Sequence, residues 1–352
     1  MDPRPLAHTP APGAVGVSPP WVVRLPSWLG DTVMALPVLR ALARRYERPL
    51  LLWGPPQFAE LLALSELRFD YLPYRRRGGV AGISDAIHAC AALRHHKPAA
   101  ALLLPNAFEP ALLARAAGIP RLVGFATDGR GALLTDRVPE PQPRHAVHEA
   151  ERFAALARHL GAELHRARDT CLAAGTSLKA RAEQLLPPPR QLVALAAGSA
   201  NTPAKRWPPD RWAALARAAR ERWGAEPVLL GSAADRTVNT EIAAAAGAPV
   251  TDLSGSSLTD LAAALLRCRV VVSNDSGAAH LAAAIGRPTV VLFGPTNPER
   301  TAPTGEHVHV VAAPCFCRPC GYRECPLDHR CLKELAPSTV LDAVAAAWEV
   351  EG

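Results

Sequence analysis

The sequence predicts an α/β protein made of two Rossmann-like, doubly wound halves that face each other across a cleft. Short apolar runs alternate with helical patterns in both halves of the chain, which is typical of parallel sheets covered by helices on both faces. A length of 352 residues suggests two domains. The triplet Pro187-Pro188-Pro189 forms a stiff boundary between the two alternating regions.

The first alternating region, residues 21–186, is expected to form the N-terminal domain. Its apolar, β-branched runs predict strands at 21–25, 50–53, 69–72, 99–104 and 121–123. Helical patterns between them predict helices at 31–45, 57–64, 84–95, 109–117 and 148–160. Residues 1–20 contain proline and glycine but no apolar core, so we expect a disordered tail there and not a signal peptide.

The second region, residues 187–352, is expected to form the C-terminal domain. Strands are predicted at 192–196, 227–230, 250–252, 270–272 and 289–293. Helices are predicted at 209–222, 234–245, 257–267, 278–285 and 338–349. Two doubly wound halves of this kind would leave a cleft at the carboxyl ends of both sheets, where such folds bind their ligands.

The positive charge is concentrated in the first half of the chain. Residues 1–175 hold 21 Lys and Arg against 15 Asp and Glu, a net charge of +6, whereas residues 176–352 hold 18 against 17, a net charge of +1. Arg40, Arg44, Arg45 and Arg48 form one cluster, and residues 75–77 form another. This distribution favours an anionic partner such as acidic lipid headgroups or a phosphorylated sugar, although a solvated basic face is an alternative interpretation.

Composition also bears on partners and location. The aromatic residues are few and do not interleave with the basic ones, so we expect no nucleic-acid partner. No apolar run approaches the roughly 20 residues that span a bilayer. We therefore expect a cytoplasmic protein with reduced cysteines.

The most informative stretch is residues 270–295, VVVSNDSGAAHLAAAIGRPTVVLFGP. A β-branched run, residues 270–272, ends in a polar turn that runs through Gly277, and a helix of small residues is expected to follow from Ala278. The free N–H groups and positive dipole at a helix N-terminus bind phosphate. Asp275, Ser276 and His280 lie beside this turn, so it predicts an anion or sugar site. An ordinary strand–helix–strand crossover with a capping turn is the alternative interpretation.

A second candidate lies at the end of the first strand, in residues 24–31, RLPSWLGD. Gly30 permits a tight turn of the backbone. Asp31 falls at the helix start, where a carboxylate has two interpretations. It caps the helix, which is worth about 1 kcal/mol, or it acts as a general base on an acceptor hydroxyl.

Two loops of the second half add hydroxyl groups and cations. Residues 198–207, GSANTPAKRW, follow the first strand of that half and place Ser199, Asn201 and Lys205 next to a helix start. The glycine spacing is not that of a phosphate-binding Walker loop, but the hydroxyls, amides and cations suit a diphosphate. Asp235 follows the next strand and either binds a ribose or caps the following helix.

Residues 315–331 form a cysteine-rich loop. Cys317 and Cys320 have the CxxC spacing of metal ligands, and Cys325 and Cys331 follow them. A structural zinc site is one interpretation, because tetrahedral zinc takes four such ligands. The other interpretation is a cluster of reduced cysteines, since the second pair is irregularly spaced.

Together these segments resemble glycosyltransferase family 9, the ADP-heptose:lipopolysaccharide heptosyltransferases, and within it the heptosyltransferase II subfamily most closely. The resemblance runs from about residue 22 to 345. The stretches that carry it are PSWLGDTVMALPVLRAL, LLPNAFEPALLARAAGIPRLVGF, GSANTPAKRWP, LLGSAADRTVNTEI and SNDSGAAHLAAAIGRPTVVLFGPTNPERTAP.

The resemblance implies the two-domain GT-B glycosyltransferase fold. It places a lipid-linked acceptor on residues 21–186 and a nucleotide sugar on residues 187–352. The implied reaction is an inverting transfer of heptose from ADP-L-glycero-D-manno-heptose to the inner-core heptose of lipopolysaccharide, with no metal required. Asp31 would act as general base, and Lys205 would stabilise the departing ADP.

The resemblance also implies the remaining contacts. Donor-binding residues are expected to be Ser199, Asn201, Asp235, Asp275, Ser276, Gly277 and His280, and acceptor-binding residues Ser27, Trp28, Gly30 and Asn106. A lipid-linked substrate implies peripheral contact with the anionic cytoplasmic face of the inner membrane. Two alternatives stay open, namely another family 9 transferase with a different donor sugar and a non-catalytic nucleotide-binding protein.

Overall fold

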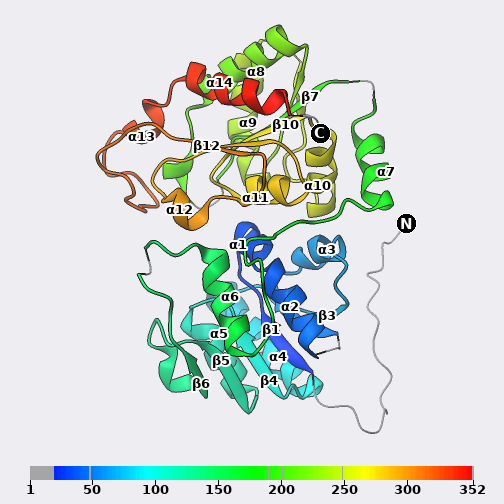
Figure 1. Cartoon of the computed structure of the whole chain (residues 1–352), viewed down its shortest axis with the longest axis vertical. Helices are drawn as coiled ribbons and strands as arrows, with labels where there is room; N and C mark the ends of the chain where they lie inside the picture. Colours follow the sequence, from blue (N-terminus) through cyan, green and yellow to red (C-terminus); the bar gives the residue numbers. More distant parts are fainter. Residues whose placement is uncertain are drawn as a thin grey trace.

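The computed structural model shows two lobes stacked along the long axis of the molecule (Figure 1). It describes residues 20–46, 49–143, 145–188, 190–199, 202–247 and 249–350. Most of the predicted tail, together with Pro189 of the predicted boundary, lies outside the described residues. We call the two halves the N-terminal lobe and the C-terminal lobe.

The N-terminal lobe contains a parallel, six-stranded sheet in the order β3-β2-β1-β4-β5-β6. Its strands are β1 (Trp21–Arg24), β2 (Leu50–Gly54), β3 (Phe69–Pro73), β4 (Ala100–Leu103), β5 (Arg121–Phe125) and β6 (Asp136–Val138). The first five strands confirm the prediction, whereas the sequence analysis missed β6. Strands β2 and β4 are buried along their whole length, as expected of a parallel sheet covered on both faces.

The C-terminal lobe repeats this topology with the order β12-β11-β10-β7-β8-β9. Its strands are β7 (Leu192–Ala196), β8 (Glu226–Leu229), β9 (Thr251–Asp252), β10 (Val270–Asn274), β11 (Thr289–Leu292) and β12 (Val308–Val311). The first five were predicted, and β12 was not. In each lobe the order reverses beside the first strand, which is the switch point where doubly wound folds bind ligands.

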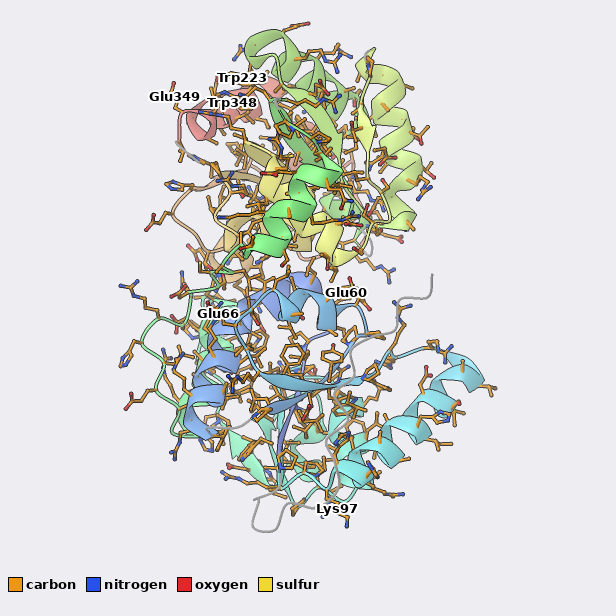
Figure 2. All side chains as sticks on the ribbon, turned by 90° about the vertical axis from the view of Figure 1, so that its right-hand side faces the viewer. Glu60, Glu66, Lys97, Trp223, Trp348 and Glu349 are labelled. Carbon is orange, nitrogen blue, oxygen red and sulfur yellow. The ribbon has the colours of Figure 1, made fainter. Side chains whose placement is uncertain are left out.

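Helices cover both sheets. The N-terminal lobe has α1 (Leu29–Met34), α2 (Leu36–Tyr46), α3 (Phe58–Ala63), α4 (Gly79–His96), α5 (Phe108–Ala116) and α6 (Glu149–His159). The following helices are α7 (Thr176–Leu185), α8 (Pro209–Trp223), α9 (Arg236–Ala246), α10 (Leu258–Arg267), α11 (Gly277–Ala284), α12 (Pro298–Thr301), α13 (Arg330–Lys333) and α14 (Pro337–Trp348). In Figure 2 the stacked rings of Trp223 and Trp348 join α8 to α14 at the far end of the C-terminal lobe.

Two predicted helices differ from the structure. The helix predicted at 31–45 is divided into α1 and α2 at Ala35. Pro37 explains the division, because it has no N–H to donate and its ring disfavours a continuous helix. Helix α4 begins five residues before the predicted start at 84, since the glycines at its beginning argued against a helix.

The chain passes from the N-terminal lobe to the C-terminal lobe between α6 and α7. Thr170 and Thr304 share a hydrogen bond, and the N–H of Leu172 donates to the carbonyl of Ala284. Helix α7 packs against α10 beside the second sheet (Figure 1). The division of the domains between residues 186 and 187 stays a prediction. Within the described residues no helix is both long and apolar enough to span a bilayer.

Candidate active site

The beginnings of α1 and α11 meet where the two lobes touch (Figure 1). Each helix follows the carboxyl end of a central strand, β1 or β10. A Cβ built on Gly30 would lie 2.8 Å from Cδ2 of His280, and one built on Gly277 would lie 2.6 Å from Cβ of Leu29. Both contacts are too short for any side chain. The two glycines therefore allow the lobes to approach as closely as they do.

Asp31 lies in the first turn of α1 and is half-buried at this junction. Its carboxylate has no hydrogen bond or ion pair within the described part of the chain, and the beginning of α1 has no side-chain cap. The capping interpretation of Asp31 is therefore wrong in this structure. The side chain is left free to act on another molecule.

Burial raises the pKa of the Asp31 carboxyl to about 7. The carboxylates of Glu149 and Asp275 raise it further, while Lys205 and Arg152 act in the opposite direction. A carboxyl with a pKa near neutrality is partly ionised at pH 7 and holds a proton more strongly than an ordinary aspartate. These are the properties of a general base poised to accept a proton.

Lys205 and Asp275 form an ion pair at the carboxyl edge of the second sheet. The Nζ of Lys205 lies 2.8 Å from Oδ2 of Asp275, and the hydroxyl of Thr296 donates to the same oxygen at 2.6 Å. Asp275 is buried, whereas Lys205 stands at the end of a short turn after β7. The carboxylate of Asp275 fixes the ammonium group of Lys205, and this ammonium group lowers the pKa of Asp31.

His280 lies one helical turn into α11 and is buried against Gly30. Burial lowers the pKa of its imidazole to about 4, although Asp275 acts in the opposite direction. The ring is therefore neutral at pH 7. It can exchange a hydrogen bond with a ligand without adding charge to the site.

Three predicted donor residues lie in the same two loops as the Lys205–Asp275 ion pair. Ser276 is the residue directly before α11, and its hydroxyl lies 3.0 Å from that of Ser273. Gly277 is the first residue of the helix, where backbone N–H groups are free to bind an anion. Ser199 is buried at the end of β7, and its carbonyl accepts a hydrogen bond from Arg206. Asn201 lies outside the described residues.

Asp235 does not cap the following helix α9, which begins without a side-chain cap bond; its carboxylate instead completes a capping box with Ser232 in the short turn before that helix. Its Oδ2 accepts hydrogen bonds from the N–H and the hydroxyl of Ser232 at 2.9 and 2.7 Å. The carboxylate is buried against Gly198, where a Cβ would lie 2.3 Å from Cγ of Asp235. Asp235 therefore holds two loops together at the sheet edge, and its contact with a ribose stays a prediction.

The predicted acceptor residues lie in the N-terminal lobe. Ser27 is exposed, Trp28 is 54% exposed, and Gly30 is buried against His280. Asn106 follows β4, the neighbour of β1, and its side-chain oxygen lies 3.5 Å from a guanidinium nitrogen of the fully buried Arg130. The four residues thus follow adjacent strands at one edge of the sheet.

Three residues that complete the junction were not predicted from the sequence. Asn274 accepts a hydrogen bond from the N–H of Trp207 and donates to the carbonyl of Ala197, which ties the end of β10 to that of β7. Glu149 and Arg152, an ion pair 2.6 Å apart in α6, are electrostatic neighbours of Asp31. The periodic pattern predicted this helix but gave no signal that it faces the site.

The cysteine-rich loop packs against the Lys205 turn. Cys317, Cys320, Cys325 and Cys331 all line one small cavity, together with Ala204, the neighbour of Lys205. The N–H of Ala204 donates to the carbonyl of Arg323 in this loop. Across the described part of the chain, no three His, Cys, Asp or Glu side chains are placed to hold a metal ion. The structure brings the four thiols to one cavity without showing a metal site.

The topology and solved relatives define a glycosyltransferase of the two-domain GT-B class. The Escherichia coli ADP-heptose lipopolysaccharide heptosyltransferase II superimposes with a TM-score of 0.78 at 28% identity, covering 94% of this chain and 98% of that one. The model of glycosyltransferase family 9 (heptosyltransferase) matches residues 88–330. The chain belongs to this family.

Two curated relatives extend over most of the chain. Lipopolysaccharide heptosyltransferase 2 of Escherichia coli strain K12 is 31% identical over 302 residues, 81% of this chain and 86% of the relative. The Salmonella typhimurium protein of the same name is 29% identical over 349 residues, 93% of this chain and 98% of the relative. The resemblance noted in the sequence to family 9 and its heptosyltransferase II subfamily is confirmed.

Proposed function

We propose that this chain transfers heptose from ADP-L-glycero-D-manno-heptose to the inner-core heptose of lipopolysaccharide, with inversion at the anomeric carbon. The names of the relatives support the substrate class. One structural observation carries the mechanism. The carboxylate of Asp31, which has no partner among the described residues and a pKa raised to about 7, lies at the junction of the lobes. The Lys205–Asp275 ion pair of the C-terminal lobe acts on it there.

The acceptor half of the reaction belongs to Asp31. Its carboxylate takes the proton from an acceptor hydroxyl as the oxygen forms a bond to the anomeric carbon of the donor. The bond from that carbon to the ADP oxygen breaks on the opposite face, which inverts the configuration. Ser27, Trp28, Gly30 and Asn106 place the acceptor on the predicted N-terminal domain, residues 21–186.

The donor half belongs to the C-terminal lobe, residues 187–352. ADP leaves with additional negative charge on its phosphate. Lys205, which Asp275 holds in an ion pair, is the cation with the largest effect on the pKa of Asp31 and is proposed to meet this charge. The hydroxyls of Ser199 and Ser276 and the free amides at Gly277 add donors for this charge. Asn201, Asp235 and neutral His280 are proposed to contact the remainder of the nucleotide sugar.

We propose that the protein's own cations replace a metal in this step, so that transfer needs no added metal ion. A zinc ion in the cysteine-rich loop would be structural. The thiolates of Cys317, Cys320, Cys325 and Cys331 would hold it and so fix the loop that supports Ala204 and Lys205. Elemental analysis tests this: one zinc per chain supports the site, and four free thiols without zinc contradict it.

The proposed location is the cytoplasm, with peripheral association at the cytoplasmic face of the inner membrane. This proposal rests on the lipid-linked acceptor and on the basic first half of the chain.

The experiment that tests the substrates measures the release of ADP from ADP-heptose. The purified chain is assayed with and without a deacylated inner-core acceptor that carries one heptose. Acceptor-dependent release supports the proposal. Release only from a different nucleotide sugar would assign another family 9 activity, and binding of ADP-heptose without transfer to any acceptor would favour a nucleotide-binding protein.

A further inference from the structure

Four arginines line one cavity at the amino edge of the C-terminal sheet. Arg190 stands just before β7, Arg269 directly before β10 and Arg287 just before β11, while Arg267 ends α10. These three strands are neighbours in the sheet, which brings the arginines together. The cavity has a volume of about 340 Å³, within the range of sites that hold small molecules. We call it the arginine cavity.

The arginine cavity is separate from the candidate active site. Strands β7 and β10 run in parallel from this cavity to the loops that carry Lys205 and Asp275. The two sites therefore lie at opposite edges of the same sheet. Arg269 donates to the carbonyl of Trp348, which Figure 2 shows at the far end of the C-terminal lobe. A ligand in this cavity leaves the donor loops free.

Positive charge in the cavity exceeds negative charge. Arg190 pairs with Glu226 at 2.7 Å, but none of the other lining residues is acidic. Arg267 and Arg269 donate to backbone carbonyls, which orient their guanidinium groups without neutralising them. Burial raises the pKa of the Cys268 thiol to about 12, so this lining residue is neutral at pH 7. Three guanidinium charges thus have no counter-ion within the described part of the chain.

Arg287 is the least satisfied of the four. It has no hydrogen bond or ion pair with any described residue, and its Nε is buried without a partner. Burial lowers the pKa of its guanidinium, and the positive charge of Arg269 acts in the same direction. A half-buried cation of this kind costs free energy unless an anion meets it. Arg287 therefore indicates a ligand and not a bond that holds the fold together.

The geometry suits a multiply charged anion with several acceptor oxygens. Guanidinium groups bind phosphate through paired N–H donors, and Nη1 of both Arg267 and Arg269 is left over from the carbonyl bonds. We propose that the arginine cavity is a second anion site of the C-terminal lobe, where Arg287 and these two arginines bind a phosphate group. The group belongs either to a small phosphorylated molecule or to free phosphate. This proposal goes beyond the proposed function and does not depend on it.

The test is calorimetric titration of the full chain with inorganic phosphate, in saturating ADP so that any donor site is filled. We expect saturable binding of phosphate and at least tenfold weaker binding of acetate at the same ionic strength. Arg287→Gln should bind phosphate at least tenfold more weakly than the unchanged chain. Arg287→Lys keeps the charge but not the paired donors, so its affinity should lie between the two.

Arg217→Gln is the matched control. Arg217 is an exposed arginine of α8 that also donates to a backbone carbonyl, and it does not line the cavity. This variant is expected to bind phosphate as the unchanged chain does. A parallel titration with glucose 6-phosphate distinguishes the two sources of the group. Tighter binding than that of phosphate assigns a phosphorylated small molecule, and equal or weaker binding assigns free phosphate.

Thermal unfolding separates a ligand site from a structural role of Arg287. Without phosphate, Arg287→Gln should have a Tm equal to or above that of the unchanged chain, because it removes an uncompensated charge. Phosphate should raise the Tm of the unchanged chain but not that of the variant. Equal phosphate binding by Arg287→Gln, or loss of phosphate binding when ADP is added, would overturn the proposal. A lower Tm in Arg287→Gln with unchanged phosphate affinity would assign this residue to the fold alone.

Discussion

The ammonium nitrogen of Lys205 lies 2.8 Å from Oδ2 of Asp275, and this ion pair joins two loops at the carboxyl edge of the C-terminal sheet. Asp275 is buried, so its carboxylate has a fixed position and holds the cation in turn. Removing one partner of such an ion pair strongly destabilises the folded protein, because the other charge is then left buried without its counter-ion. The pair therefore links the chemistry of the site to the stability of the lobe.

Replacing Lys205 with alanine is expected to reduce both donor binding and transfer. The change removes the cation nearest to the departing ADP, and it leaves Asp275 without its partner, at a loss of about 1–3 kcal/mol in the free energy of unfolding. ADP titration, steady-state kinetics and chemical denaturation measure the three effects. Lys179→Ala, at an exposed position of α7, is the matched control and should change none of them. Unchanged kinetics in Lys205→Ala would remove this residue from the site.

The pH dependence of transfer is expected to follow the ionisation of Asp31. Because a base must be deprotonated and its pKa is about 7, kcat/KM should fall about tenfold per pH unit below that value. Lys205 lowers this pKa, so the acidic limb should move to higher pH in Lys205→Ala. Rate profiles of both proteins from pH 5 to 9 measure the shift. A limb near pH 4, or no movement in the variant, would contradict the assignment.

Asp31→Asn is expected to stabilise the protein at alkaline pH. The pKa of the carboxyl rises from an ordinary 3.8 to about 7 on folding, so the folded state binds the proton more tightly. Stability is therefore lost as pH rises from about 4 to 7, and the loss persists above pH 7. With allowance for partial exposure, the variant should gain on the order of 2 kcal/mol at pH 8 and little at pH 4. Denaturant unfolding at the two pH values measures the difference, and an equal effect at both would contradict the raised pKa.

Gly277→Ala is expected to push the lobes apart. The new Cβ would lie 2.6 Å from Cβ of Leu29, a distance that forces α1 and α11 to separate. We expect kcat/KM to fall at least tenfold, while each lobe stays folded by circular dichroism. Gly175→Ala is the matched control, because a Cβ there meets nothing within 4 Å and its φ is −63°. Equal rates in the two variants would show that the close contact is not needed for transfer.

Removal of divalent metal is expected to leave transfer intact. In the proposed mechanism, Lys205 and the amides at the beginning of α11 supply the positive potential that a metal supplies in other transferases. The measurement is the initial rate after dialysis against EDTA, with circular dichroism as the check on folding. A folded protein that regains activity only when magnesium or manganese is added would contradict metal-independent chemistry.

The sequence predicted ten of the strands, nine of them because a largely apolar run stands between turn signals; the tenth, β9, is an edge pair of Thr251 and Asp252 that follows the apolar Val250. It missed β6 and β12, which are short edge strands that contain charged or imidazole side chains. Edge strands of this kind lack the continuous apolar pattern of the central ones. The helical periodicity is the same on both sides of Pro37, so the pattern predicted one helix where the proline divides it into α1 and α2.

Residues of the candidate site could be predicted where they directly follow the end of a strand. Residues that only tertiary packing brings to the site could not. Asp31, Lys205, Asp275 and His280 each stand in a turn or first helical turn after a central strand, so topology alone brings them to the sheet edges. Glu149 and Arg152 come from α6, far away in sequence, and only packing places them near Asp31. Asp235 had two interpretations from its position, and neither anticipated its bonds to Ser232 in the turn before α9, because they depend on the local fold of that loop.

The proposed general-base role of Asp31 is tested by measuring ADP release by the Asp31→Asn variant. Asparagine keeps the shape of the side chain but cannot accept the proton. Asp210→Asn, at an exposed first-turn position of α8, is the matched control. We predict that Asp31→Asn binds ADP-heptose with nearly unchanged affinity while acceptor-dependent ADP release falls at least a thousandfold, and that Asp210→Asn releases ADP at the rate of the unchanged protein. Release by folded Asp31→Asn within tenfold of that rate would contradict the account.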